Sequence, residues 1–188
     1  MELSREELLR ELPEINQIQD ERLREQVIAV WQDVARESPH ATLAECPWGS
    51  AMPHVRLMDH IRSVTRVALA LADVLSREDG HQINRDILLA GALLHDVSKI
   101  VEFTRDEQGN VVHTDKGRML EHAFIGAAVA RSHGLPLEVL HIINGHSPYS
   151  PVPPRTLEAV VLTYADLAQV DTLYFSAGIL SDRLAKRR

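Results

Sequence analysis

Six histidine and aspartate side chains stand at wide intervals along the chain, each beside or within an apolar stretch. Two of them, His95 and Asp96, are adjacent and follow directly after a continuous apolar run. Burying an imidazole and a carboxylate there without partners costs several kcal/mol, and a metal ion is one partner that removes this cost. The other four stand singly at His60, His122, His146 and Asp166. We therefore take these six as candidate metal ligands.

The donor types limit which metals such a site would hold. Mixed imidazole and carboxylate donors suit divalent transition-metal ions, here Fe, Mn, Co, Ni or Zn. The set lacks both the all-oxygen shell that Ca²⁺ prefers and the thiolates of structural zinc sites. Cys46 is the single cysteine of the sequence. The identity of the metal stays open.

Hydrophobic periodicity places the candidate ligands on or beside helices. Apolar residues recur at three- and four-residue steps from Met58 to Leu75, and an almost entirely apolar helix is expected over 84–94. Further helices are expected over 118–132, 136–144 and 155–172. Packing in a bundle can bring one polar residue from each helix to a common point. The sequence therefore predicts an all-α helical bundle.

Two segments depart from this pattern. Between residues 100 and 114, β-forming residues flank the turn-forming stretch Asp106–Asn110, which predicts a short β-hairpin flap. Residues 1–50 are expected to form an N-terminal helical cap, broken near Pro13, followed by a proline-rich loop. Residues 51–188 are then the metal-binding domain, packed with the cap as one globular unit.

The order His60, His95-Asp96, His122, His146, Asp166 resembles the HD superfamily of metal-dependent phosphohydrolases, over about residues 55–175. Within that superfamily, residues 94–102 and 146–159 resemble the HD portion of bacterial exoribonucleases that join it to an OB domain. The OB domain of those enzymes is absent from this sequence. The resemblance implies an HD-domain helical bundle.

The resemblance also implies how the ligands are shared between two divalent ions. His60, His95, Asp96 and Asp166 would hold one ion, and His122 and His146 the second, with Asp96 bridging. A pair of ions polarises a phosphoryl oxygen and generates a bridging hydroxide as nucleophile. The implied reaction is hydrolysis of a phosphomonoester or phosphodiester, with a nucleotide as the expected substrate.

Residues next to the ligands are candidates for catalysis and positioning. Lys99 lies one helical turn after His95, and its ammonium would neutralise charge on the phosphate, so Lys99 and Asp96 are the catalytic candidates. Asp59, Arg62 and Glu121 adjoin ligands and are candidates for orienting them or binding substrate. The remaining histidines and both tryptophans are interpreted as structural.

Two other functions are compatible with the same ligands. Mixed-valence diiron oxygenases of the HD superfamily use this six-ligand arrangement on small polar substrates. A metal-containing sensing module would keep the ions only for folding. Substrate-dependent oxygen uptake separates the first of these from a hydrolase.

Composition narrows the partners and the compartment. A formal net charge of −7 with a pI near 5.8 gives no general attraction to long nucleic acids, so a small phosphate ester is the expected partner. No apolar run approaches the roughly 18 residues that a membrane span needs. The acidic start of the chain is unlike a secretory signal, which predicts the cytoplasm. The apolar stripe of the N-terminal helices and Leu173–Phe175 either pack internally or form a homodimer face.

Overall fold

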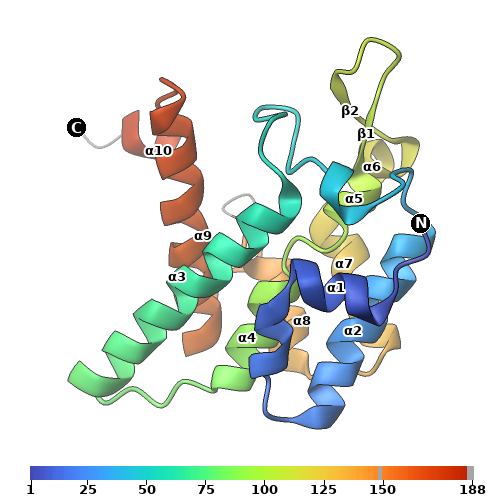
Figure 1. Cartoon of the computed structure of the whole chain (residues 1–188). Helices are drawn as coiled ribbons and strands as arrows, with labels where there is room; N and C mark the ends of the chain where they lie inside the picture. The colour runs from blue at the N-terminus through green and yellow to red at the C-terminus, as the bar shows by residue number, and fades with distance from the viewer. Residues whose placement is uncertain (148–149, 186–188) are drawn as a thin grey trace.

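The computed structural model describes residues 1–147 and 150–185. They form a helical bundle with a small two-stranded hairpin (Figure 1), which confirms the predicted all-α fold and its short flap. The α-helices are α1 (Arg5–Glu11), α2 (Glu21–Arg36), α3 (Leu57–Glu78), α4 (Arg85–Leu94), α5 (Lys99–Glu102), α6 (Asp115–Met119), α7 (His122–Ser132), α8 (Leu137–Gly145), α9 (Leu157–Ser176) and α10 (Asp182–Ala185). The short elements are the 3₁₀ turns η1 (Pro13–Gln17) and η2 (Leu43–Glu45) and the antiparallel strands β1 (Phe103–Arg105) and β2 (Val111–His113).

Helix α4 is the centre of the bundle. The side chain of Asn84 caps its start by accepting hydrogen bonds from the backbone of Asp86 and Ile87, each at 3.1 Å. Every residue from Leu88 to Leu94 is buried, and the helix contacts α2, α3, α8 and α9. Because it is enclosed on all sides, the residues directly after its last turn emerge inside the protein rather than at the surface.

Helices α3 and α9 lie side by side along one flank of the bundle (Figure 1). Their facing apolar residues, such as Val64 and Leu162, share one core cluster with α4 and α8. This packing holds the start of α3 against the middle of α9. Among the described residues, no helix combines the length and the apolar composition that crossing a membrane requires.

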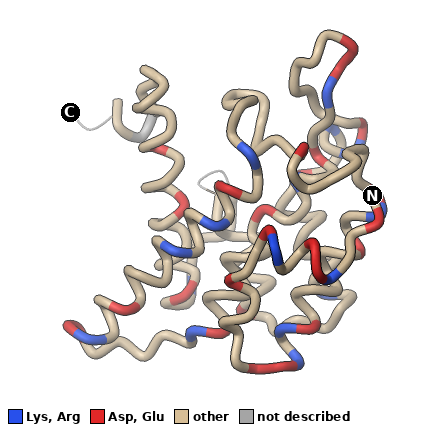
Figure 2. Tube along the Cα trace, in the orientation of Figure 1, with Lys and Arg blue, Asp and Glu red and all other residues tan. Residues whose placement is uncertain are grey.

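The N-terminal helices share the main core of the protein. Trp31 on α2 is fully buried, and its indole donates a hydrogen bond to the carbonyl oxygen of Leu93 at 3.1 Å. Glu14 on η1 is also buried and pairs with Arg62 and Arg66 of α3, at 3.3 and 2.9 Å. The cap is therefore fixed to both α3 and α4. Figure 2 shows basic residues interspersed with acidic ones along the helices.

The structure corrects two predicted boundaries. Val101, expected in a strand, lies in α5, and the strands begin only at Phe103. The helix predicted over 118–132 is two helices: Thr114 caps α6, Leu120 is extended with φ of −132°, and α7 starts afresh. His122 is consequently the first residue of α7. The break depends on contacts between α5 and α6, which helical periodicity does not report.

Gly91 allows α4 and α8 to approach each other closely. A Cβ atom at this position would lie 2.6 Å from Ile142 Cδ1 and 3.0 Å from Ile142 Cβ, and both residues are buried. We expect Gly91→Ala to lower the free energy of unfolding by about 1–2 kcal/mol. Overpacking costs about 1–3 kcal/mol, and the better helix propensity of alanine returns up to about 1 kcal/mol.

Urea denaturation measures this change. Gly49→Ala is the control, because a Cβ atom there meets Phe103 only at an ordinary 3.9 Å. If Gly91→Ala were as stable as the unsubstituted protein, α8 could move away from α4 freely and the close approach would have no structural importance.

Candidate metal centre

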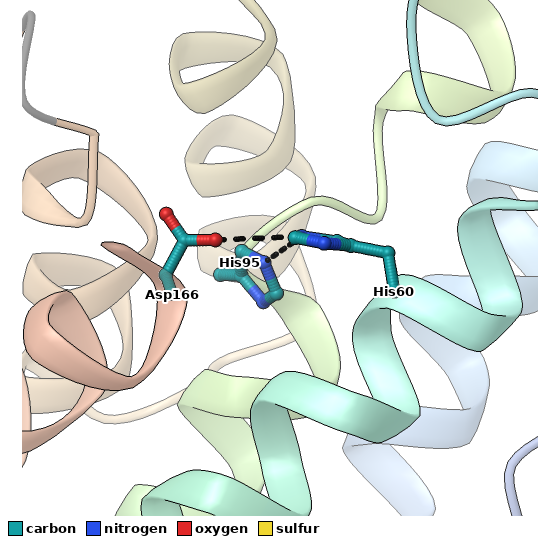
Figure 3. A group of neighbouring side chains, drawn as sticks. All are labelled: His60, His95 and Asp166. Carbon is teal, nitrogen blue, oxygen red and sulfur yellow. Dashed lines mark hydrogen bonds and ion pairs between the residues drawn. The ribbon is translucent and has the colours of Figure 1, made fainter. Parts of the chain in front are cut away.

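A first group of ligand-type side chains meets where α3, α4 and α9 come together (Figure 3). His60 comes from the first turn of α3, His95 directly follows α4, and Asp166 comes from the middle of α9. His60 Nε2 lies 3.2 Å from His95 Nε2 and 3.4 Å from Asp166 Oδ1. One potential ligand atom from each residue falls within 4.8 Å of the others, which is close enough for a single ion to contact all three.

A second group lies beside the first and consists of Asp96, His122 and His146. The Nε2 atoms of both histidines are 3.4 Å from Asp96 Oδ1 and 3.4 Å from each other. His122 begins α7 and His146 directly follows α8, so both imidazoles are presented from helix ends. The structure thus brings all six predicted residues together in two adjacent groups.

Asp96 joins the two groups through its two carboxylate oxygens. Oδ2 is 3.3 Å from His60 Nε2 and 3.7 Å from His95 Nε2, on the side of the first group. Oδ1 faces His122 and His146 of the second group. The Asp96 carboxylate is therefore oriented so that each oxygen could bind a different cation.

Three imidazoles direct an unprotonated nitrogen toward the centre. His95 Nδ1 donates to the carbonyl oxygen of Ala92 at 2.7 Å, and His146 Nδ1 donates to that of Ile143 at 2.8 Å. His60 Nδ1 contacts Gln169 Oε1 at 2.8 Å. Because these acceptors place the proton on Nδ1, the Nε2 lone pairs are left to point inward, as in most histidine ligands of metals.

This arrangement fits a bound cation. Nitrogen lone pairs converging at 3.2 Å repel each other unless a positive charge lies between them. Asp96 Oδ1 is buried and has no hydrogen-bond partner among the residues that the structure describes, although it is an ionised acceptor. Transition-metal ions would satisfy both the nitrogens and this oxygen.

The HD domain model matches residues 57–170, a range that includes all six candidate ligands. The chain belongs to the HD domain family. The resemblance inferred from the sequence is thus confirmed at the level of the family.

Two relatives illustrate the range of HD proteins that this chain resembles. A dihydroneopterin 2',3'-cyclic phosphate phosphodiesterase of Methanocaldococcus jannaschii is 36% identical over 162 residues, which cover 81% of this chain and 64% of the relative. A ribonuclease Y of Acidothermus cellulolyticus is 36% identical over 96 residues, or 51% of this chain and 16% of the relative. The chain thus matches less than two thirds of the length of either relative. No solved structure matches the chain.

Burial favours the neutral form of two imidazoles of the HD site, while neighbouring charges keep the central carboxylate ionised. Burial lowers the pKa of both His95 and His122 to about 3, so their nitrogens are free to bind a metal at neutral pH. Burial alone would raise the pKa of Asp96, but the Lys99 ammonium and the adjacent His95 hold it well below its usual value. Burial would likewise lower the pKa of His146, yet Asp96 raises it, so the field at this point favours a positive charge.

Lys99 faces the centre from α5, as its position one turn after His95 predicts. Its ammonium is 3.4 Å from Glu102 Oε2 and lies 5.9 and 5.4 Å from the ring centres of Trp48 and Phe103. Burial would lower its pKa, but the carboxylates of Asp96 and Glu102 outweigh that effect and raise it. Lys99 is therefore a largely buried group whose charged form is favoured at the HD site.

Three residues that the sequence analysis did not assign to the site also lie in it. Gln169, which orients His60, is one helical turn after Asp166 on α9, and this spacing could have suggested it. Glu102 is buried between Lys99 and His122, with its Oε2 3.8 Å from His122 Nδ1. The indole of Trp48 donates to Asp96 Oδ2 at 3.2 Å. Trp48 belongs to an irregular loop, so no periodic pattern marks it.

Two candidate positioning residues point elsewhere. Asp59 is exposed and pairs with Arg56 at 3.4 Å, whereas Arg62 pairs with Glu14 of the N-terminal cap at 3.3 Å. Neither side chain lies on the face of α3 that carries His60, because only every third or fourth residue of a helix faces the same way. The sequence neighbourhood of a ligand was a poor guide here.

A cavity of about 380 Å³ opens beside the second group of ligands. His122 and Glu102 form part of its wall, together with the candidate Glu121, which is exposed at the start of α7. Its other lining residues include Arg118, Leu120 and Asn144. The mixture of polar and apolar side chains suits a small organic ligand.

Proposed function

We propose that this HD protein is a metal-dependent phosphohydrolase that uses two divalent transition-metal ions to hydrolyse a small, nucleotide-like phosphate ester. The observation that supports it best is the orientation of Asp96, whose two oxygens face two separate sets of ligands. Sites with two adjacent metal ions recur in enzymes that cleave phosphate esters by in-line displacement.

The ligands divide between the two ions according to these contacts. His60, His95 and Asp166 would hold one ion with Asp96 Oδ2, and His122 and His146 the other with Asp96 Oδ1. When bound, two such ions polarise a phosphoryl oxygen and lower the pKa of water. Fe, Mn, Co, Ni and Zn are all compatible with this donor set.

The protein's own groups bind and orient the ester. The Lys99 ammonium stabilises the negative charge that builds up on the phosphoryl oxygens, in a partly buried setting where such a charge has a large effect. The cavity beside His122 takes the organic group. In the reaction, the oxygen of water bonds to phosphorus while one P–O ester bond breaks and its oxygen leaves as a hydroxyl.

A cyclic phosphodiester is the substrate class that we favour. The name of the Methanocaldococcus relative gives a 2',3'-cyclic phosphate as its substrate, and that relative matches 81% of this chain. Long nucleic acid is disfavoured, since the net charge is −7 and basic residues are interspersed with acidic ones (Figure 2). A pterin or nucleoside carrying a cyclic phosphate would be small enough for one cavity.

Metal content is the decisive test. Protein purified anaerobically is expected to contain about two equivalents of transition metal by elemental analysis, and His122→Ala about one, because the variant loses an imidazole of the second group only. His133→Ala is the matched control: His133 pairs with Asp33 at 2.9 Å, outside the site, and its removal should leave both equivalents in place.

The activity assay uses a panel of 2',3'-cyclic nucleotides and dihydroneopterin 2',3'-cyclic phosphate. Release of a phosphomonoester by the two-metal protein, and its loss in His122→Ala, would support the proposal. A metal content of one equivalent unaffected by His122→Ala would contradict the two-ion site. Substrate-dependent oxygen uptake without hydrolysis would contradict the hydrolase and indicate a diiron oxygenase instead.

A further inference from the structure

Trp48 lies in the loop between η2 and α3, and the loop fixes its backbone firmly. The backbone N–H of Trp48 donates to the carbonyl oxygen of Val55 at 2.9 Å, and that of Leu57 donates to Cys46 at 3.0 Å. These bonds and the bridge between Pro47 and Arg56 close the loop at its base. Leu57 begins α3, and His60 lies in the first turn of the same helix. The closed loop therefore fixes the position of Trp48 relative to His60.

The indole of Trp48 reaches over the metal centre. Its Nε1–H donates to Asp96 Oδ2 at 3.2 Å, and its ring lies 4.9 Å from the imidazole of His60, centre to centre. The ring is also 6.2 Å from that of Tyr174 on α9 and 5.9 Å from the Lys99 ammonium. Trp48 thus contacts two candidate ligands but offers no lone pair of its own to a metal.

We propose that Trp48 is a positioning residue for the bridging carboxylate. Its N–H holds Asp96 Oδ2 on the side of the first group of ligands, which turns Oδ1 toward His122 and His146. This inference rests on the two-ion site proposed above. It assigns a role in that site to a residue outside the HD match, which begins at residue 57.

The freedom of the Asp96 carboxylate explains why a hydrogen bond from another residue would help to orient it. An ionised carboxylate can rotate about its Cβ–Cγ bond and can bind a single ion through both oxygens. Oδ1 accepts no hydrogen bond from the described residues, and its nearest imidazole nitrogens, on His122 and His146, lie 3.4 Å away. Oδ2 retains a lone pair for an ion after accepting the indole N–H. The hydrogen bond from Trp48 therefore favours the bridging orientation without occupying the ligand position.

The test compares Zn²⁺ affinities of variants by competition with a chromophoric chelator. Trp48→Phe keeps an aromatic ring against His60 but removes the N–H, whereas Trp48→Leu removes both. We expect the second Zn²⁺ equivalent to bind roughly 10–100-fold more weakly in both variants, the usual consequence of losing a partner that orients a metal ligand. The first equivalent should be much less affected.

Trp31→Phe is the matched control. Its indole N–H also makes one buried hydrogen bond, but to the carbonyl oxygen of Leu93 rather than to a carboxylate. This variant is expected to lose thermal stability and to keep the affinity for the second Zn²⁺. A loss of affinity in Trp48→Leu but not in Trp48→Phe would overturn the proposal, because the ring and not the donor would then be responsible.

A second measurement needs no substitution at Trp48. In ¹H–¹⁵N spectra of the unsubstituted protein, the two indole N–H signals are assigned with the help of Trp31→Phe. The Trp48 signal is expected to shift as Zn²⁺ is added, and a signal that does not move at either equivalent would overturn the proposal. If the unsubstituted protein binds two equivalents and Trp48→Phe binds the second Zn²⁺ with unchanged affinity, the positioning role of Trp48 is rejected but the two-ion site is not. A single equivalent in the unsubstituted protein rejects the two-ion site, and this inference with it.

Discussion

Asp96→Asn is expected to remove both metal ions and to slow hydrolysis at least about 1,000-fold, equivalent to about 4 kcal/mol of transition-state stabilisation. The two oxygens of Asp96 face the two ligand groups, so this one carboxylate is within reach of both. An amide keeps the shape of the side chain but loses the negative charge and replaces one oxygen with a nitrogen that cannot bind a metal. The fold should survive, because the volume hardly changes.

Elemental analysis and hydrolysis of a cyclic phosphate measure the two effects. Asp59→Asn is the control: Asp59 lies beside His60 in the sequence but is exposed and pairs with Arg56. It should retain both ions and full activity. If Asp96→Asn kept two equivalents of metal, the bridging role of this carboxylate would be wrong.

The helices that frame the centre could be predicted because each buries one regular face. Apolar periodicity placed the start of α3 within one residue, although α3 continues past Leu75 to Glu78, and it placed the end of α4 at its last residue. These two helices place His60 and His95. The break between α6 and α7 could not be predicted in this way. It depends on Thr114 as a cap and on Gly117, where any Cβ atom would collide with the carbonyl oxygen of Glu102. Such a contact exists only once the chain has folded.

The grouping of the six candidate ligands could be predicted for a related reason. A polar residue that interrupts a buried apolar face needs a partner, and the six candidates are the interruptions that the folded helices bring together. The hydrogen bonds that orient His95 and His146 are also local, since each joins Nδ1 to the carbonyl oxygen three residues earlier. Two helix ends therefore present their imidazoles in the same way, independently of the rest of the fold.

The groups around the ligands obey no such pattern. Trp48 reaches Asp96 across 48 positions of sequence, from a loop whose shape is set by its own hydrogen bonds. Glu102, the last residue of α5, lies beside His122, the first residue of α7. Apolar periodicity in a sequence indicates which residues face a core, but it does not indicate which loop covers a site in that core. Sequence reasoning therefore found the six side chains that the fold brings together, and missed the residues that contact and orient them.

Lys99→Met is the second substitution with a large expected effect, and it should separate catalysis from metal binding. We expect a decrease in kcat of about 100- to 1,000-fold, as for the loss of one group that stabilises charge in a transition state. Both ions should remain, because the ammonium contacts Glu102 and the rings of Trp48 and Phe103 rather than any ligand. The unbranched methionine side chain can pack against the same rings.

Whether the substitution changes kcat or KM identifies the role of Lys99. A fall in kcat with metal content unchanged means that the ammonium stabilises the transition state, whereas a rise in KM alone means that it only binds the phosphate. Lys116→Met, which removes a partly exposed lysine paired with Glu37, should change neither kcat nor metal content. If Lys99→Met instead lost its metal, the charge of Lys99 would be needed to keep Asp96 ionised. The main contribution of Lys99 to the site would then be to lower the pKa of the Asp96 carboxylate.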